Sequence, residues 1–127
     1  MTTIRTQHDA ATQHDAIFAE AFKAMFEAMA HAVHANAVAK GFWEGDRNRA
    51  EAIALMHAEL SEALEALRNG NPPDEHLPEF GSVAVELADV VIRIMDYSDA
   101  HGHDVGLAIV AKHRYNLGRA YRHGKEF

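Results

Sequence analysis

Residues 82–100 read SVAVELADVVIRIMDYSDA, and they determine the expected fold. One apolar row recurs there at the steps of three and four residues that are typical of a helix: Val83, Leu87, Val90, Ile94 and Tyr97. A second set covers most of the remaining circumference: Val85, Ala88, Val91, Ile92 and Met95. A helix that is apolar nearly all round is buried in a core or in an oligomer.

The polar residues of this helix form one narrow strip: Glu86, Asp89, Arg93 and Asp96. Buried charges must be paired or must bind a metal ion. An ion pair between Asp89 and Arg93, four residues apart, is one interpretation of the strip. It leaves Glu86 and Asp96 to be explained.

In this strip, Glu86 and Asp89 form an acidic pair three residues apart. Another acidic pair with the same spacing, Glu59 and Glu62, lies earlier in the chain. Residues three apart lie on one face of a helix, so two antiparallel helices can bring all four carboxylates together. Two carboxylates about 4 Å apart repel each other by about 4 kcal/mol at an effective dielectric constant of 20. A hard divalent cation removes this repulsion, and Mg²⁺ in particular is usually bound together with substrate phosphates. The alternative is two solvated helix faces.

Three further helices are expected, over residues 15–40, from Asp46 or Asn48 to Arg68, and over 104–117. The first carries a row of Phe and Met residues that is most simply core. The second carries a predicted core row: Ile53, Met56, Leu60, Leu64 and Leu67. Its Glu59 and Glu62 share a flanking face with Leu55 and alanines, so this face is expected to be covered or to line a cleft. We therefore predict an all-α protein with four main helices and a bundle completed by oligomerisation.

The length of 127 residues suits one helical domain, 15–127, after a flexible N-terminal arm, 1–14. The chain has no cysteine, which excludes disulfides and thiolate zinc sites. Its net charge of −7 argues against binding to nucleic-acid polymers, which requires a basic surface. The chain start lacks the apolar run of a signal peptide, and no stretch is long enough to span a membrane. We expect a cytoplasmic protein.

Several smaller features each have two interpretations. The repeated His-Asp at 8–9 and 14–15 either binds metal or is inert, and the run His101-Gly102-His103-Asp104 is either a zinc ligand set or an exposed turn. Trp43, in the connection that follows the first helix, either plugs the end of the bundle or stacks on a base. The basic segment 119–125 either attracts phosphate or is a solvated tail.

Together these residues resemble the MazG-like family of all-α nucleoside triphosphate pyrophosphohydrolases, which is related to the dimeric dUTP and dCTP hydrolases. The family signature is E-x-x-E followed, after roughly one to three dozen residues, by E-x-x-D. The chain has Glu59-Leu60-Ser61-Glu62 and then Glu86-Leu87-Ala88-Asp89, with Lys40-Gly41-Phe42-Trp43 before them and Lys112, Asn116, Arg119 and His123-Gly124-Lys125 after them. The similarity covers about residues 30–125. Ala120 stands where the family pattern has a proline.

The resemblance implies a set of site residues. The metal ligands for Mg²⁺, with Mn²⁺ as a substitute, are Glu59, Glu62, Glu86 and Asp89. Glu62 is the expected general base and acts with Glu59 in catalysis. The phosphates and sugar are assigned to Lys112, Asn116 and Arg119, and the base pocket to Trp43 and His34.

The implied reaction is hydrolysis of a nucleoside or deoxynucleoside triphosphate to the monophosphate and pyrophosphate, as nucleotide-pool house-cleaning. The implied assembly is a homodimer or homotetramer. Two alternatives stay open. One is a non-catalytic helical oligomer or regulatory module, and the other is a pyrophosphohydrolase that acts on a different substrate such as phosphoribosyl-ATP.

Overall fold

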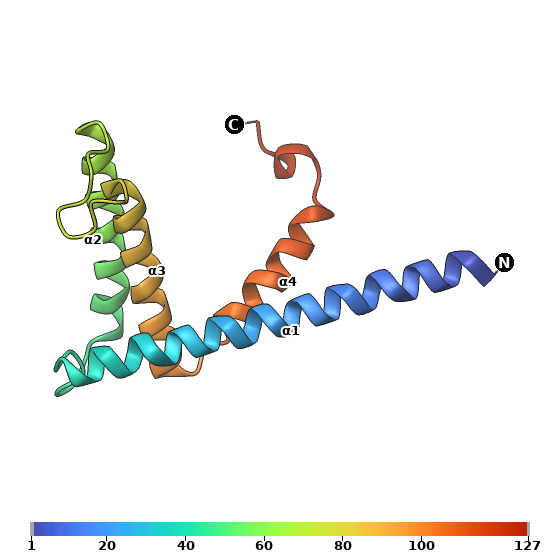
Figure 1. The fold of residues 1–127 in the computed structure, drawn as a ribbon, viewed down its shortest axis with the longest axis horizontal. Coiled ribbons are helices and arrows are strands. Elements are labelled where there is room, and N and C mark those ends of the chain that lie inside the picture. The colour runs from blue at the N-terminus through green and yellow to red at the C-terminus, as the bar shows by residue number, and fades with distance from the viewer. Residues whose placement is uncertain (1, 127) are drawn as a thin grey trace. The chain divides into compact units, whose positions relative to one another are not determined.

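The computed structural model describes the backbone of residues 2–126 and the side chains of residues 15–126. It contains four main helices, α1 Thr2–Ala39, α2 Arg49–Arg68, α3 Ser82–His101 and α4 Val105–Leu117, followed by the short 3₁₀ helix η1, Tyr121–Gly124 (Figure 1). Residues 2–126 contain no β-strand. The predicted all-α fold with four main helices is confirmed.

Helix α1 begins earlier than the sequence pattern predicts. Its backbone is helical from Thr2, through the segment 2–14 for which we expected an arm. The side chains of residues 1–14 lie outside the described set, and so does most of the repeated His-Asp that was considered as a metal site. None of the described helices is both long enough and apolar enough to cross a lipid bilayer.

The other helices begin and end at recognisable caps. The side chain of Asn48 accepts hydrogen bonds from the backbone N–H groups of Ala50 and Glu51 at the start of α2. The Asp104 carboxylate accepts one from the N–H of Leu107 at the start of α4. These side chains satisfy donors that have no partner inside their helices. The starts of α2 and α4 therefore follow from local sequence.

The chain divides into two compact units, each described by itself. One unit contains Met29–Gly102, and the other contains Met1–Ala28 together with His103–Phe127. Within the first, α2 and α3 pack against each other and run antiparallel (Figure 1). This is the arrangement that the two acidic pairs require if they are to face each other.

The face that α2 buries is not the predicted core row. Its buried residues are Ala52, Glu59 and Ala63. In the described chain most of the predicted row is exposed, namely Ile53, Leu60, Leu64 and Leu67. The small alanine side chains allow close packing, whereas the leucine row points away. The prediction that this row forms the core of the single chain is therefore wrong.

In the second unit, α4 crosses close to α1. A Cβ atom on Gly106 would lie 2.9 Å from the Cβ of Phe26, so only glycine fits at this approach. Asp104, the cap of α4, forms an ion pair with Lys23 of α1 at 3.6 Å. Val110 is buried, but Phe18 and Met25 of the predicted apolar row on α1 are exposed. A two-helix unit has too few neighbours to cover both sides of such a row.

The connection between α2 and α3 is fixed onto the first turn of α3. Asn71 adopts a positive φ of 51°, and its side-chain oxygen accepts a hydrogen bond from the N–H of Val83 at 2.9 Å. The carbonyl of Pro72 accepts hydrogen bonds from both the N–H and the hydroxyl of Ser82. Because Gly81 has no side chain with which to cap α3, Asn71 provides the cap. This loop thereby sets where α3 begins, one turn before Glu86.

Candidate metal site and adjoining pocket

Three carboxylates converge between α2 and α3. Glu59, Glu62 and Glu86 each offer one oxygen, and these oxygens all lie within 4.8 Å of one another. Glu59 is only 8% exposed, Glu86 is half-buried and Glu62 is exposed. The cluster therefore opens to solvent on the side of Glu62. The i, i+3 spacing on α2 and the antiparallel packing of α3 together account for the convergence.

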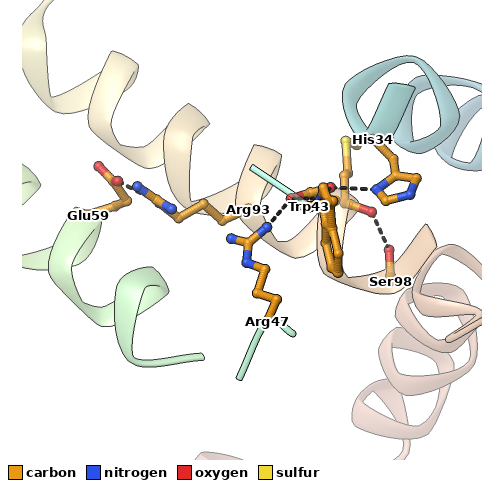
Figure 2. A network of polar contacts seen from close by, with 8 residues as sticks. His34, Trp43, Arg47, Glu59, Arg93 and Ser98 are labelled. Atoms are coloured by element: carbon orange, nitrogen blue, oxygen red, sulfur yellow. Dashed lines mark hydrogen bonds and ion pairs between the residues drawn. The ribbon is translucent and has the colours of Figure 1, made fainter. Parts of the chain in front are cut away.

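Arg93 compensates the charge of the most buried member of this cluster. Its Nε donates to Oε1 of Glu59 at 2.6 Å, across the gap between α3 and α2 (Figure 2). An ion pair of Arg93 with Asp89 on its own helix is one of the two interpretations that the sequence allows. In the described residues the ion pair of Arg93 is with Glu59 instead, because the packed neighbour offers a more buried carboxylate.

Asp89, the fourth acid of the two motifs, is not one of the three converging carboxylates. It lies one turn after Glu86 on α3 and lines the pocket described below. Burial raises its pKa above the ordinary 3.8, and the negative charge of Glu59 adds to this effect, while Arg93 opposes it. The pKa of Glu86 is raised above 4.5, first by burial and then by the charge of Glu62. The site therefore carries uncompensated negative potential.

The donor set fits a hard divalent cation. All three converging groups are carboxylates, the ligands that Mg²⁺ and Mn²⁺ prefer, and the cluster contains neither a thiolate nor an imidazole. A Mg²⁺ ion with ligands at about 2.1 Å needs ligand oxygens roughly 3–4 Å apart. Small side-chain rotations bring three oxygens that lie within 4.8 Å of one another to that spacing. The side of the cluster that opens to solvent leaves room for water or phosphate ligands.

A pocket of about 510 Å³ lies between α1 and α3, within the unit 29–102. The apolar part of its lining consists of Met29, Ala32, Val33, Ala37, Phe42 and Ile92. The polar part consists of Asn36, Arg47, Asp89, Arg93 and Asp96. This size and composition are typical of small-molecule sites. Arg93 lines the pocket and also holds Glu59, so the pocket and the acidic cluster adjoin each other through this side chain.

Asp96 is the centre of a hydrogen-bond network at one end of the pocket. Its carboxylate is 8% exposed and accepts hydrogen bonds from Nδ1 of His34 at 2.7 Å, from Nε1 of Trp43 at 2.9 Å and from Nη1 of Arg47 at 3.1 Å (Figure 2). A buried carboxylate is stable when its lone pairs are filled in this way. The network fastens the connection after α1 to the middle of α3.

The ring of Trp43 is enclosed by the same network. The Arg47 guanidinium lies 4.6 Å from the ring centroid, over its face. The imidazoles of His34 and His101 meet the ring edge to face, at 5.0 and 5.8 Å between centroids. Trp43 is not among the residues that line the pocket, whereas Phe42 beside it does line the pocket and is 68% exposed.

Lys112, Asn116 and Arg119 belong to the other unit. Lys112 and Arg119 both approach the ring of Tyr115, at 4.7 and 5.7 Å from its centroid. Lys112 and Asn116 line one open cavity of about 400 Å³. The side-chain oxygen of Asn116 is buried there without a hydrogen-bond partner among the described residues. The three side chains thus share one region of α4 and the turn after it.

Sequence reasoning missed several residues of the site. Asp96 is one of the charges that the sequence leaves unexplained, and its place in the polar strip of α3 is the available signal. For Phe42 the signal is its place beside Trp43 in the segment that resembles the family. Arg47 and Asn36 have no signal of their own, because their place in the pocket lining depends on how the connection after α1 folds onto α3. The roles of His34 and Trp43 in substrate binding stay predictions.

Comparisons of the chain with protein-family models, with curated proteins and with solved structures found no significant match.

Proposed function

We propose that this protein hydrolyses nucleoside or deoxynucleoside triphosphates to the monophosphate and pyrophosphate in a Mg²⁺-dependent reaction. The observation that carries this proposal is the convergence of Glu59, Glu62 and Glu86 within 4.8 Å, next to a ligand-sized pocket. The resemblance of the two acidic motifs to MazG-like enzymes supplies the reaction type. The geometry supports three of the four acids of the motifs, Glu59, Glu62 and Glu86, and Asp89 lies outside the cluster.

The roles of the acidic residues follow from their surroundings. Glu59, Glu62 and Glu86 would hold the cation, with Asp89 one turn after Glu86. Glu62 is exposed and forms no ion pair or hydrogen bond among the described residues, so its carboxylate is available to take a proton from the attacking water. The chemistry that Mg²⁺ would supply there is neutralisation of phosphate charge and a lowered pKa for that water.

The resemblance assigns the substrate phosphates and sugar to Lys112, Asn116 and Arg119. These side chains would offer charge and hydrogen bonds that stabilise the charge developing on a leaving pyrophosphate. The exposed leucine row of α2 supports assembly as a homodimer or homotetramer, because a second copy would cover it.

The test is release of pyrophosphate from a panel of ribo- and deoxynucleoside triphosphates and phosphoribosyl-ATP, with Mg²⁺ or Mn²⁺. Turnover of one or more nucleotides that requires metal and is lost in Glu62→Gln supports the proposal. Absence of turnover of every nucleotide by folded protein would overturn it.

One observation favours the non-catalytic alternative. The Arg93–Glu59 ion pair provides an internal counter-charge that stabilises the cluster without metal. In a purely structural module, Glu62→Gln would change stability or assembly, and the wild-type protein would bind neither metal nor nucleotide. A titration of Mg²⁺ in which Tm is measured at each concentration distinguishes the enzyme from the structural module.

A further inference from the structure

Trp43 is the aromatic ring that the resemblance assigns to the base, and its contacts argue against this role. Its indole N–H is bound to Asp96, one face is covered by the Arg47 guanidinium and its ring contacts two imidazoles. A base that stacked on the covered face would have to displace Arg47 and break its hydrogen bond to Asp96. Trp43 is therefore suited to positioning the loop.

Phe42 has the properties that Trp43 lacks. It lines the 510 Å³ pocket, and its side chain is among the more exposed aromatic rings of the unit 29–102. Its backbone is also held in place. Gly41, at φ 84°, ends α1, the N–H of Gly41 donates to Val38 O, and the N–H of Phe42 donates to Ala37 O. This paired arrangement is the Schellman motif, and it fixes the direction in which the chain leaves the helix.

Asn36 provides an uncommitted polar group in the same pocket. Its side-chain amide makes no hydrogen bond to the other described residues, whereas Arg47, Arg93 and Asp96 all bind protein partners. An amide presents one acceptor and two donors, the combination that can pair with the edge of a nucleic-acid base. It lies on α1, fewer than two turns before Phe42.

The polar and aromatic groups that line the pocket come from two parts of the unit. Asp89 and Arg93 lie on α3, where Arg93 is bonded to Glu59 of the acidic cluster, and Asn36 and Phe42 lie on α1 and in the connection after it. A ligand with a phosphate end and a flat, polar-edged ring matches these two sets of groups. The apolar residues Val33 and Ile92 would cover the body of such a ring.

We infer that Phe42 stacks on the base of the nucleotide and that the Asn36 amide forms hydrogen bonds with the edge of this base. Trp43 and Asp96 act as positioning residues that hold the loop of Phe42 in place. This inference rests on the proposed function and names the residues that set its base preference. It also accounts for the adjacent aromatic residues, since one ring contacts the ligand and the other anchors the loop.

The experiment compares Phe42→Ala with Phe80→Ala, a matched control. Phe80 is 53% exposed in the connection before α3 and does not line the pocket. Steady-state pyrophosphate release is measured with the preferred nucleotide and with inorganic tripolyphosphate, which has no base. Phe42→Tyr keeps the stacking surface, and circular dichroism confirms that each variant is folded.

Phe42→Ala is expected to raise KM for the nucleotide about 5- to 100-fold, the range for loss of one base–aromatic stack, with a smaller change in kcat. Phe42→Tyr and Phe80→Ala should stay near wild type, and tripolyphosphate kinetics should be unchanged. Asn36→Leu should reduce the discrimination between the best and second-best base by about tenfold.

The inference would be overturned if Phe42→Ala kept wild-type kinetics, or if it lost kcat/KM equally on the nucleotide and on tripolyphosphate. Either result would leave the proposed function standing. Retained base ranking in Asn36→Leu would remove Asn36 from the assignment. Suppose that Trp43→Phe loses kcat/KM tenfold on the nucleotide but not on tripolyphosphate, while Phe42→Ala keeps wild-type kinetics. That result would assign the stacking role to Trp43. No turnover of any nucleotide by the wild-type protein would overturn the proposed function and this inference together.

Discussion

At the scale of single residues, the site is defined by how each charge is compensated. Glu59 is buried and paired with Arg93, and Asp96 is buried and surrounded by three donors. Glu62 and Glu86 have no comparable partner among the described side chains. Negative charge is therefore concentrated on the two carboxylates beside the solvent, where a cation can reach them.

Arg93→Gln removes the counter-charge of Glu59 and is expected to lower stability without metal. The loss should be about 1–3 kcal/mol, below the 3–5 kcal/mol of a fully buried pair, because the Arg93 side chain is 35% exposed. Thermal unfolding in EDTA measures this. Saturating Mg²⁺ should raise Tm more in the variant than in the wild type, since the cation replaces the lost charge. An equal rise in both proteins would contradict this role.

The raised pKa values of Glu86 and Asp89 predict a specific pH dependence. A carboxyl whose pKa is higher in the folded chain binds more protons when folded than when unfolded. Stability without metal should therefore fall as pH rises from the ordinary values of 4.5 and 3.8 through the raised folded values. Saturating Mg²⁺ should abolish this loss of stability at pH values above the raised pKa values, because the bound cation stabilises both ionised carboxylates.

The pH contribution is measured as the difference in unfolding free energy between wild type and Glu86→Gln from about pH 4 to about pH 7. The difference removes the titration of histidines elsewhere in the chain. A variant that becomes relatively more stable as pH rises is the expected result. A constant difference would show that Glu86 titrates normally.

At the scale of helices, the site depends on the register of α2 and α3. The periodicity of the sequence predicts these helices and the facing acidic pairs, because both are local patterns. It does not predict that α2 buries the face of Ala52 and Ala63 instead of its leucine row. Nor does it predict that Trp43 and Arg47 fold onto Asp96, since that choice depends on contacts between residues about 50 positions apart.

Asn71 tests the register of α3 directly. Asn71→Gly preserves the positive φ but removes the hydrogen bond to the N–H of Val83. The expected cost is about 1 kcal/mol, the typical net contribution of one hydrogen bond. It should be accompanied by weaker Mg²⁺ stabilisation, because Glu86 lies one turn after the start of α3. Urea unfolding with and without Mg²⁺ measures both effects. A stability loss that leaves the Mg²⁺ effect intact would separate this cap from the site.

At the scale of the whole molecule, the described residues include exposed apolar side chains that a partner could cover. The row Ile53, Leu60, Leu64 and Leu67 lies along one side of α2, at the spacing with which one helix packs on another. In a homodimer or homotetramer, a second copy would bury it.

Leu64→Asp places a charge in this row and is expected to shift the protein toward monomer in size-exclusion chromatography with light scattering. Ala54→Asp, on another exposed side of α2, is the matched control. Wild-type protein should show a Tm that rises with protein concentration. A monomeric wild type whose Tm is independent of concentration would contradict assembly through this face.

In the proposed function, the acidic cluster is a metal site for nucleotide hydrolysis. The most direct test is Mg²⁺-dependent pyrophosphate release from the nucleotide panel, with wild type, Glu62→Gln and the control Glu65→Gln, an exposed residue one turn further along α2. We predict turnover in wild type and Glu65→Gln and a loss of at least about 100-fold in Glu62→Gln, the scale of a general base. Metal-independent turnover, or equal rates in all three proteins, would contradict the claim.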